Sequence, residues 1–254
     1  CEYCRTGRYN ICPGVDFMAT QPNYKGALTQ YMTHPEEWTY HIPEGMTTME
    51  GALVEPAAVG MHAAVLGGAQ PGKSIVILGG GTIGLMVLQA CISLGATDIT
   101  VVDVIEKRLE LAKKLGAARV INGKEEDTVA VLRSEEMYGD HGVDLVFEAA
   151  GAVFTAQQAV QIVSRGGKIM MVGTQSKPVP IDFLKINREV TIQTSFRYCN
   201  NFPQTIEAIS SGRFNVKDMV TNIYDYEDVQ KAFEEAIDPV KKTEMVKGVI
   251  KVAE

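Results

Sequence analysis

The chain has 254 residues, enough for one large or two smaller domains, and its 46% hydrophobic and 22% charged residues are typical of a globular protein. A net charge of −7, without a block of about five like charges, argues against nucleic-acid and membrane partners and favours a small-molecule substrate. We expect a cytoplasmic protein, because no apolar run approaches the roughly 18 residues that cross a bilayer and no signal-peptide layout opens the chain.

Three of the cysteines, Cys1, Cys4 and Cys12, stand close together at the start of the chain. Cys91 lies in an apolar helical pattern and Cys199 stands alone, so the spacing does not predict a disulfide framework. The three clustered thiols are therefore the candidates for binding a metal.

The pattern of apolar and turn-forming residues changes near residue 55. Residues 1–54 are punctuated by glycine, proline and asparagine and hold only isolated β-prone stretches such as 27–33 (ALTQYMT). We therefore predict that this first segment is irregular.

From residue 55 on, short apolar runs alternate with longer helical patterns. Strands are predicted at 74–79, 99–104, 119–122, 143–151, 168–174 and 190–196, with helices at 82–95, 106–116, 126–139 and 152–167 between them. Buried strands joined by helices predict parallel pairing through right-handed crossovers, and hence a doubly wound parallel α/β sheet.

The last part of the chain is too short to form a domain of its own. Its patterns predict helices at 203–212 and 226–236 and strands at 219–224 and 248–253. We expect this tail to pack against the irregular first segment.

Gly79, Gly81 and Gly84 form a G-x-G-x-x-G motif directly after a predicted strand and at the start of a predicted helix. The first glycine permits a tight turn, the second lets the backbone approach a pyrophosphate, and the third lets helix and strand pack closely. The helix start offers free N–H groups to the phosphates. The alternative is that these glycines serve packing only.

Asp103 ends the second predicted strand, 19 residues after Gly84. A carboxylate there can accept hydrogen bonds from both ribose hydroxyls and repel a 2′-phosphate, which favours NAD over NADP. Lys107 and Arg108 follow closely and could attract such a phosphate; for Arg108 the alternative is an ordinary solvated helix residue.

Five stretches together carry a family resemblance. They are CEYCRTGRYNIC (1–12), DFMAT (16–20), LVEPAAVGMHAA (53–64), the glycine turn and FRYCN (196–200). With them the chain resembles the zinc-dependent medium-chain dehydrogenases, and FRYCN resembles the polyol (sorbitol or xylitol, L-iditol 2-dehydrogenase) branch in particular.

The resemblance implies a Rossmann NAD-binding domain at 55–196. It implies that 1–54 and 197–254 are parts of a β-rich, GroES-like catalytic domain. It further implies NAD and zinc as cofactors, oxidation of a polyol to a ketose, and a homo-oligomer, either a tetramer or a dimer. Threonine or butanediol dehydrogenase on the same scaffold and a non-catalytic NAD-binding module remain the alternatives.

By resemblance, Glu55 binds the catalytic zinc or its water, and Arg197 and Tyr198 orient Glu55 and the substrate hydroxyls. Phe17 and Thr20 resemble residues of the pocket wall. On the residues alone, Glu55 could be only a helix-start acid, and Arg197 and Tyr198 could simply end a strand.

The resemblance also places the coenzyme along several strand ends. Ile83 is expected at the pyrophosphate, and the residues expected around the nicotinamide half are Val172, Gly173, Thr174, Ser195, Phe196 and Arg197. His62 follows Glu55 by two helical turns, roughly 10 Å of rise, so we interpret it as a structural histidine.

Two zinc sites follow from the resemblance. The other ligands of the catalytic zinc, a cysteine and a His-Glu pair, belong in the family to a segment before residue 1, so we expect an N-terminally truncated chain. Cys1, Cys4 and Cys12 match the last three positions of the family's C-x₂-C-x₂-C-x₇-C lobe, a structural zinc site whose remaining cysteine would lie three residues upstream.

Overall fold

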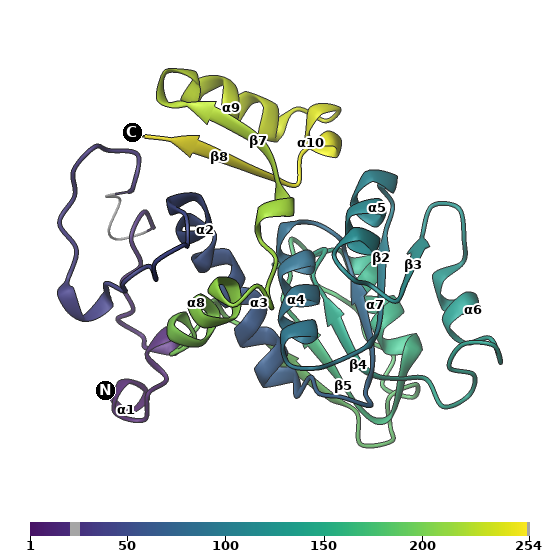
Figure 1. Cartoon of the computed structure of the whole chain (residues 1–254). Coiled ribbons are helices and arrows are strands. Elements are labelled where there is room, and N and C mark those ends of the chain that lie inside the picture. Colours follow the sequence, from purple (N-terminus) through teal and green to yellow (C-terminus); the bar gives the residue numbers. More distant parts are fainter. Residues whose placement is uncertain (21–25, 253–254) are drawn as a thin grey trace.

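A computed structural model describes residues 1–20 and 26–252, and its centre is a six-stranded parallel sheet (Figure 1). The strand order is β3-β2-β1-β4-β5-β6. The strands are β1 (Ser74–Leu78), β2 (Asp98–Asp103), β3 (Arg119–Asn122), β4 (Val143–Glu148), β5 (Val163–Met171) and β6 (Thr191–Thr194). This order reverses at β1, and the prediction of a doubly wound parallel sheet is confirmed.

Helices connect the first five strands, and apolar side chains are buried on both faces of the sheet. They are α4 (Thr82–Ser93), α5 (Glu106–Lys114), α6 (Thr128–Leu132) and α7 (Val153–Ile162). Within β1, Ile75 and Ile77 belong to one hydrophobic core, whereas Val76 and Leu78 belong to a second core on the opposite face. Successive side chains of a strand point to opposite faces, so the continuous apolar run of β1 fills both layers.

Two predicted helices are shorter than their sequence patterns. The pattern at 126–139 yields only α6, whose first N–H groups are capped by the Asp127 carboxylate. The pattern at 152–167 yields α7, and the chain then turns extended at Val163, which pairs with Val143. Gly166 has φ +68°, a left-handed conformation that a continuing helix does not use, so this part of the predicted helix belongs to β5 instead.

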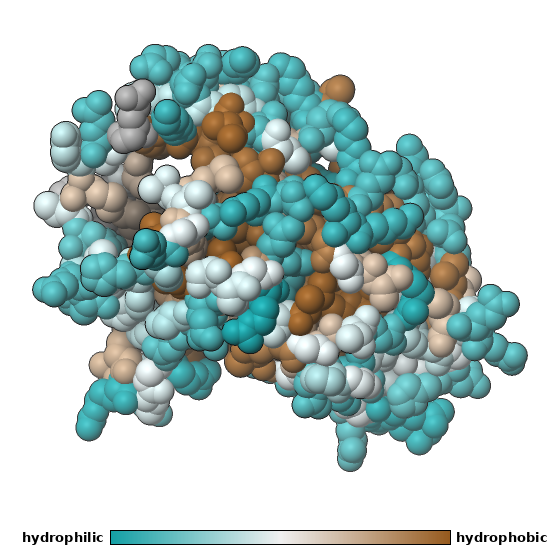
Figure 2. All heavy atoms as spheres, viewed as in Figure 1, coloured by the Kyte–Doolittle hydropathy of each residue, from teal (hydrophilic) through white to brown (hydrophobic). Residues whose placement is uncertain are grey.

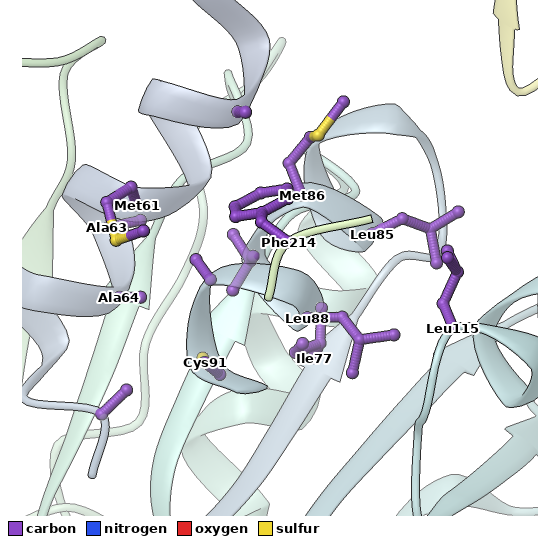
Figure 3. Close-up of a cluster of buried hydrophobic side chains, with 14 of the residues drawn as sticks. Met61, Ala63, Ala64, Ile77, Leu85, Met86, Leu88, Cys91, Leu115 and Phe214 are labelled. Atoms are coloured by element: carbon purple, nitrogen blue, oxygen red, sulfur yellow. The ribbon is translucent and has the colours of Figure 1, made fainter. Parts of the chain in front are cut away.

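Helix α3 (Val54–Gly67) precedes the sheet and packs closely against α4 (Figure 3). A Cβ at Gly60 would lie 2.5 Å from the backbone carbon of Met86, so only glycine allows the two helices to approach this far. Met61 and Ala64 face this contact together with Phe214 from the tail of the chain. The core therefore includes residues that precede the sheet in the sequence and residues that follow it.

The first segment is poorer in regular structure than a β-rich domain would be. Among its described residues it holds α1 (Glu2–Arg5) and α2 (Thr48–Ala52) and no strand of two or more residues. The β-prone stretch 27–33 is not in a strand, so the described part of the first segment is mainly irregular, as its glycine, proline and asparagine content predicts. An extended segment gains ladder hydrogen bonds only from a neighbouring strand, and neither sheet in the described part of the chain contributes one.

The tail forms helices and a second, two-stranded sheet. Its elements are α8 (Phe202–Ser210), β7 (Val220–Asp225), α9 (Val229–Ile237), α10 (Lys241–Glu244) and β8 (Lys247–Lys251). β7 and β8 pair in parallel, and residue 253 of the strand predicted at 248–253 lies outside the described residues. In the described residues there are also four short 3₁₀ helices: Tyr9–Ile11, Glu36–Trp38, Lys217–Met219 and Tyr226–Asp228.

The tail packs against the first segment, as its length led us to expect. Tyr40 stacks on Phe202 with ring centroids 5.2 Å apart, and Lys217 lies 3.3 Å from the buried Glu50 carboxylate. The domain boundaries expected at residues 54 and 196 stay predictions. One hydrophobic core contains residues from both sides of each position, so the packing does not mark a boundary there.

Hydrophobic side chains gather near the middle of the face in Figure 2, and hydrophilic ones surround them. Within the described ranges, none of the helices combines the length and the apolar character needed to span a bilayer.

Candidate functional site

Two glycines of the predicted coenzyme turn are required by the packing of the protein itself. Gly79 has φ +109°, and a Cβ there would lie 2.8 Å from the backbone nitrogen of Ala150. At Gly84 a Cβ would fall 1.8 Å from the carbonyl oxygen of Gly79, which no side-chain movement could relieve. Both residues let β1 turn tightly into α4.

Gly81 is different, because nothing in the described protein crowds it. The nearest atom to a Cβ at this position would be Nη1 of Arg108, at 3.9 Å. Gly81 is the N-cap of α4 and offers no side-chain acceptor to the first-turn N–H groups, which include that of Ile83. The opening therefore leaves room and free donors for an anionic group, which fits the pyrophosphate of a dinucleotide.

Asp103 is 8% exposed at the end of β2, and its carboxylate is held by backbone donors. Oδ2 accepts from the Gly80 N–H at 2.7 Å, and Oδ1 accepts from the N–H groups of Val104 and Ile105 at 2.8 and 2.9 Å. The acid thus fixes the glycine turn and the β2–α5 connection at once. Each carboxylate oxygen can accept about two bonds, so Oδ2 keeps capacity for a ribose hydroxyl.

Arg108 lies beside this acid, with Nη1 3.6 Å from Oδ2 of Asp103. Its Nε is buried without a hydrogen-bond partner among the described residues. The tail passes close by, because Lys107 pairs with Glu244 and the Thr82 hydroxyl donates to the Val246 carbonyl. Segments far apart in sequence therefore meet at the adenosine end of the predicted coenzyme site.

The residues predicted around the nicotinamide follow the carboxyl ends of β5 and β6. The N–H groups of Val172 and Gly173 donate to the Glu148 carbonyl at 2.8 and 2.9 Å. The Ser195 N–H donates to Met171 at 2.9 Å, while the buried Ser195 hydroxyl has no partner in the described part of the chain. Thr174 and Phe196 are exposed at the same edge.

Glu148 is a residue of this edge that the sequence analysis did not select. It is fully buried at the end of β4, where Oε1 accepts from the N–H groups of Ala150 and Gly151 and from the Thr155 hydroxyl. Oε2 accepts from the Gln175 amide at 2.7 Å. Glu148 therefore ties the loop after β4 to the loop after β5, and its position at the end of an apolar strand, like that of Asp103, was the available signal.

A hollow of about 1140 Å³ opens between the first segment and the start of α3. Glu55, in the first turn of α3, lines it together with Tyr198 and Phe17. The other lining residues are Tyr9, Val15, Asp16, Met18, Gly26, Leu28, Thr29, Tyr31, Met32, Thr33, His34, Pro35, Trp38, Tyr40 and Phe202. The wall is thus mainly aromatic and apolar, and the Glu55 carboxylate and the Tyr198 phenol lie close to each other in it.

Burial and the negative charge of Glu55 raise the pKa of Tyr198 to about 12. The phenol therefore keeps its proton at neutral pH and can donate a hydrogen bond, while the Glu55 carboxylate accepts one. Such a pair recognises a hydroxyl group, which both donates and accepts.

Arg197 lies against the Phe17 ring and close to Tyr198, and its expected role toward Glu55 and the substrate stays a prediction. Its guanidinium carbon lies 3.9 Å from the centroid of the Phe17 ring, and no ion pair with Glu55 occurs among the described residues. Its backbone is left-handed, with φ +52°. Thr20 donates to the Phe17 carbonyl at 2.9 Å and is not among the lining residues, so it supports the wall from behind.

The segment 196–200 is held by the start of the chain, through contacts that the sequence gave no reason to expect. Asn10, 5% exposed, donates to the Phe196 carbonyl at 2.9 Å. The Asn200 N–H donates to the Tyr9 hydroxyl at 2.8 Å, and the Cys199 thiol donates to the Gly7 carbonyl at 2.8 Å. The lobe that carries the three clustered cysteines thus supports the segment that carries Tyr198.

His62 lies outside the hollow. Its Nδ1 is 3.0 Å from the Asn201 amide oxygen, and burial lowers the pKa of the imidazole. These contacts support its interpretation as a structural histidine.

Cys1, Cys4 and Cys12 have the spacing of one face of a zinc tetrahedron. The Cys1 sulfur lies 3.7 Å from that of Cys4 and 3.4 Å from that of Cys12, against about 3.8 Å for two sulfurs on a tetrahedral zinc. The Gly14 N–H donates to the Cys12 sulfur at 3.4 Å, a contact typical of a metal-bound thiolate. These residues fit a structural zinc with one further ligand.

The catalytic zinc is a different case. In the described ranges the three cysteines are the sole group of three or more potential ligands, and Glu55 stands apart from them. Glu55 would supply one ligand or a hydrogen bond to a bound water, so the described residues do not form a complete catalytic metal site.

The parallel sheet, the glycine turn and the acid at the end of β2 define the class of the protein as a Rossmann-type α/β protein. The sequence model of the family described as "Zinc-binding dehydrogenase" matches residues 82–211. The chain belongs to this family.

Two curated relatives and one solved structure illustrate the similarity. The zinc-type alcohol dehydrogenase-like protein YdjJ of Escherichia coli, described as uncharacterized, is 64% identical over 100% of this chain and 72% of its own length. Sorbitol dehydrogenase of Bacillus subtilis is 41% identical over 93% of this chain and 67% of its own. A crystal structure of an Escherichia coli oxidoreductase of unknown specificity superposes with a TM-score of 0.97, at 63% identity over 100% of this chain and 72% of that one.

Proposed function

We propose that the protein oxidises a secondary hydroxyl of a polyol to a ketone, with NAD as the hydride acceptor. The observation that carries the proposal is the Glu55–Tyr198 pair inside the large hollow, next to the carboxyl ends of the parallel strands. Sorbitol dehydrogenase is among the relatives, which supports a polyol as the substrate class.

The described residues suggest how a polyol would be held. The Glu55 carboxylate accepts a hydrogen bond from one substrate hydroxyl, and the protonated Tyr198 phenol donates to another. Phe17 and Trp38 provide apolar walls that keep water away from the reacting carbon. A bound zinc would lower the proton affinity of the substrate oxygen and NAD would accept the hydride, with the remaining zinc ligands predicted from the resemblance alone.

The choice of NAD over NADP depends on Asp103. Its carboxylate is fixed by three backbone N–H groups, so it cannot turn away from a 2′-phosphate, and repulsion between the two negative charges disfavours NADP. Arg108 would have the opposite effect and favour NADP, because its guanidinium lies beside Asp103 and could bind a 2′-phosphate.

Fluorescence titration of this chain with NADH and NADPH tests the coenzyme. We expect NADH to bind at least tenfold more tightly. Equal affinities would show that Arg108 outweighs Asp103 and would overturn the choice of NAD. The variant Asp103→Gly should bring the affinities for NADH and NADPH closer together. The midpoint of thermal unfolding is the control for folding.

Reduction of NAD by the full-length gene product tests the substrate. Sorbitol, xylitol, threonine and 2,3-butanediol would be compared by kcat/KM at one pH. The proposal predicts that a polyol has the highest value. Preferential turnover of threonine or butanediol would be consistent with a dehydrogenase but would refute a polyol as its substrate. No turnover of any alcohol, with NADH still bound, would favour a non-catalytic NAD-binding module.

A further inference from the structure

A second cavity, of about 380 Å³, lies at the amino end of β5 and beside the segment that leads into β6. Its lining residues are Arg133, Asp140, His141, Val163, Ser164, Arg165, Leu184, Lys185, Asn187, Arg188 and Val190. Val172, Gly173 and Thr174, predicted at the nicotinamide, follow the opposite end of the same strand. The cavity is therefore separate from the coenzyme and substrate sites.

The lining of this cavity is strongly basic. Arg133, Arg165, Lys185 and Arg188 bring four positive charges against the single carboxylate of Asp140, an excess of three, in a chain whose net charge is −7. None of the four forms an ion pair with a carboxylate anywhere in residues 1–20 and 26–252. The positive charge is thus concentrated here and is not neutralised by the protein.

Arg133 is fixed in place by backbone carbonyls. Its Nε donates to Gln161 at 2.9 Å, Nη1 to Gly139 and Asp140 at 3.3 Å each, and Nη2 to Val163 at 3.0 Å. A guanidinium has five N–H groups, so four are used and one on Nη2 remains. The carbonyl partners carry no full negative charge, so they do not neutralise Arg133, and the lining of the cavity keeps a positive potential.

Ser164 adds a second, buried donor. It is 2% exposed, and it lines the cavity. A Cβ at Gly167 would lie 2.7 Å from this hydroxyl oxygen, so glycine at 167 leaves the space around it open. The cavity therefore has rigid donors at Arg133 and Ser164, with the exposed Arg165, Lys185 and Arg188 around them.

We propose that this cavity binds a phosphate group, either free or carried by a small phosphate ester. A phosphate dianion offers several strong acceptor oxygens, which match guanidinium forks, an ammonium group and a hydroxyl. A single carboxylate would use fewer of these donors and would balance less of the excess charge. The volume of about 380 Å³ accommodates the phosphate together with a small organic group.

Isothermal titration calorimetry with inorganic phosphate tests the proposal. The protein is saturated with NADH beforehand, so that the glycine turn is not the phosphate acceptor, and chloride keeps the ionic strength constant. We expect one site with a millimolar or lower Kd. The double variant Arg165→Gln/Arg188→Gln should weaken binding at least tenfold, because two charged donors are removed.

The matched control is Lys124→Gln/Lys231→Gln, which removes the same charge from exposed positions outside the cavity. It should leave the phosphate Kd within twofold. No binding to the wild type, an unchanged Kd in the cavity variant, or an equal loss in the control would each overturn the proposal. Titration with a hexose monophosphate, beside the neutral hexose, then separates the two sources: tighter binding than inorganic phosphate identifies a phosphate ester, and equal binding identifies the free ion.

Discussion

The glycine turn and the hollow around Glu55 are built in opposite ways. In the turn, Gly79, Gly84 and Asp103 are fixed by backbone contacts to the strand ends and loops around them. The hollow depends on side chains that join distant parts of the chain, such as Asn10, which reaches Phe196.

We therefore expect the turn to contribute mainly to the stability of the protein and the hollow mainly to recognition of the substrate. Close backbone packing in the turn leaves no alternative arrangement, so changes there should affect the folding of the whole sheet. Around the hollow, the described residues contribute side-chain hydrogen bonds and aromatic ring contacts, so changes there should affect substrate binding more than folding.

The largest effect is expected for Gly84→Ala. The new Cβ would overlap the Gly79 carbonyl oxygen at 1.8 Å, and relief requires that α4 move away from β1. We expect a loss of about 3 kcal/mol in the free energy of unfolding, measured by urea denaturation. Gly14→Ala, where a Cβ would meet nothing within 4 Å, is the control and should change stability by less than about 0.5 kcal/mol. Equal values for the two variants would contradict the packing role of Gly84.

A smaller effect is expected for Asn10→Ala, which leaves the Phe196 carbonyl without its donor. The free energy of unfolding should fall by about 1–3 kcal/mol. In the full-length enzyme KM for the polyol should also rise, because the segment that carries Tyr198 is released. The exposed Gln204→Ala is the control. An unchanged KM in Asn10→Ala would show that the first segment does not support the substrate site.

The smallest effect is a pH dependence at His62. Burial lowers its pKa in the folded state, so below pH 6.5 the unfolded chain takes up the proton first. The stability that the neutral imidazole contributes is present above pH 6.5 and is lost as the pH falls toward the lowered pKa. Urea midpoints at pH 7.5 and 5.5 should therefore differ more in the wild type than in His62→Gln. The same difference in both proteins would assign the pH effect to other groups.

The sheet could be predicted from the sequence because its signals are local. Apolar runs such as 74–79, glycine spacing and the acid at Asp103 each reflect contacts between neighbouring elements. The early end of the helix predicted at 152–167 was missed, since the pairing of Val163 with Val143 overrides the helical pattern. The sequence pattern at 126–139 likewise gave no sign that α6 ends at Leu132.

The site was predicted less completely, for a physical reason. Glu55 and Tyr198 were expected together from family resemblance, and the structure brings them together in one hollow. The supports of that hollow could not be derived, because Asn10 and Tyr9 reach partners almost two hundred residues away and no periodicity in the sequence records such pairs. Glu148 could have been found, since it ends an apolar strand as Asp103 does.

The most direct test of the account is the variant Glu55→Gln in the full-length enzyme, with polyol kinetics and NADH affinity measured on the same preparation. We propose that Glu55 acts at the substrate, and it is not part of the glycine turn. We therefore expect kcat/KM to fall by about 100-fold, a loss on the order of 3 kcal/mol in transition-state stabilisation, while the Kd for NADH stays within twofold. Equal losses in turnover and NADH binding, or an unchanged kcat/KM, would contradict the central claim that Glu55 acts on the substrate.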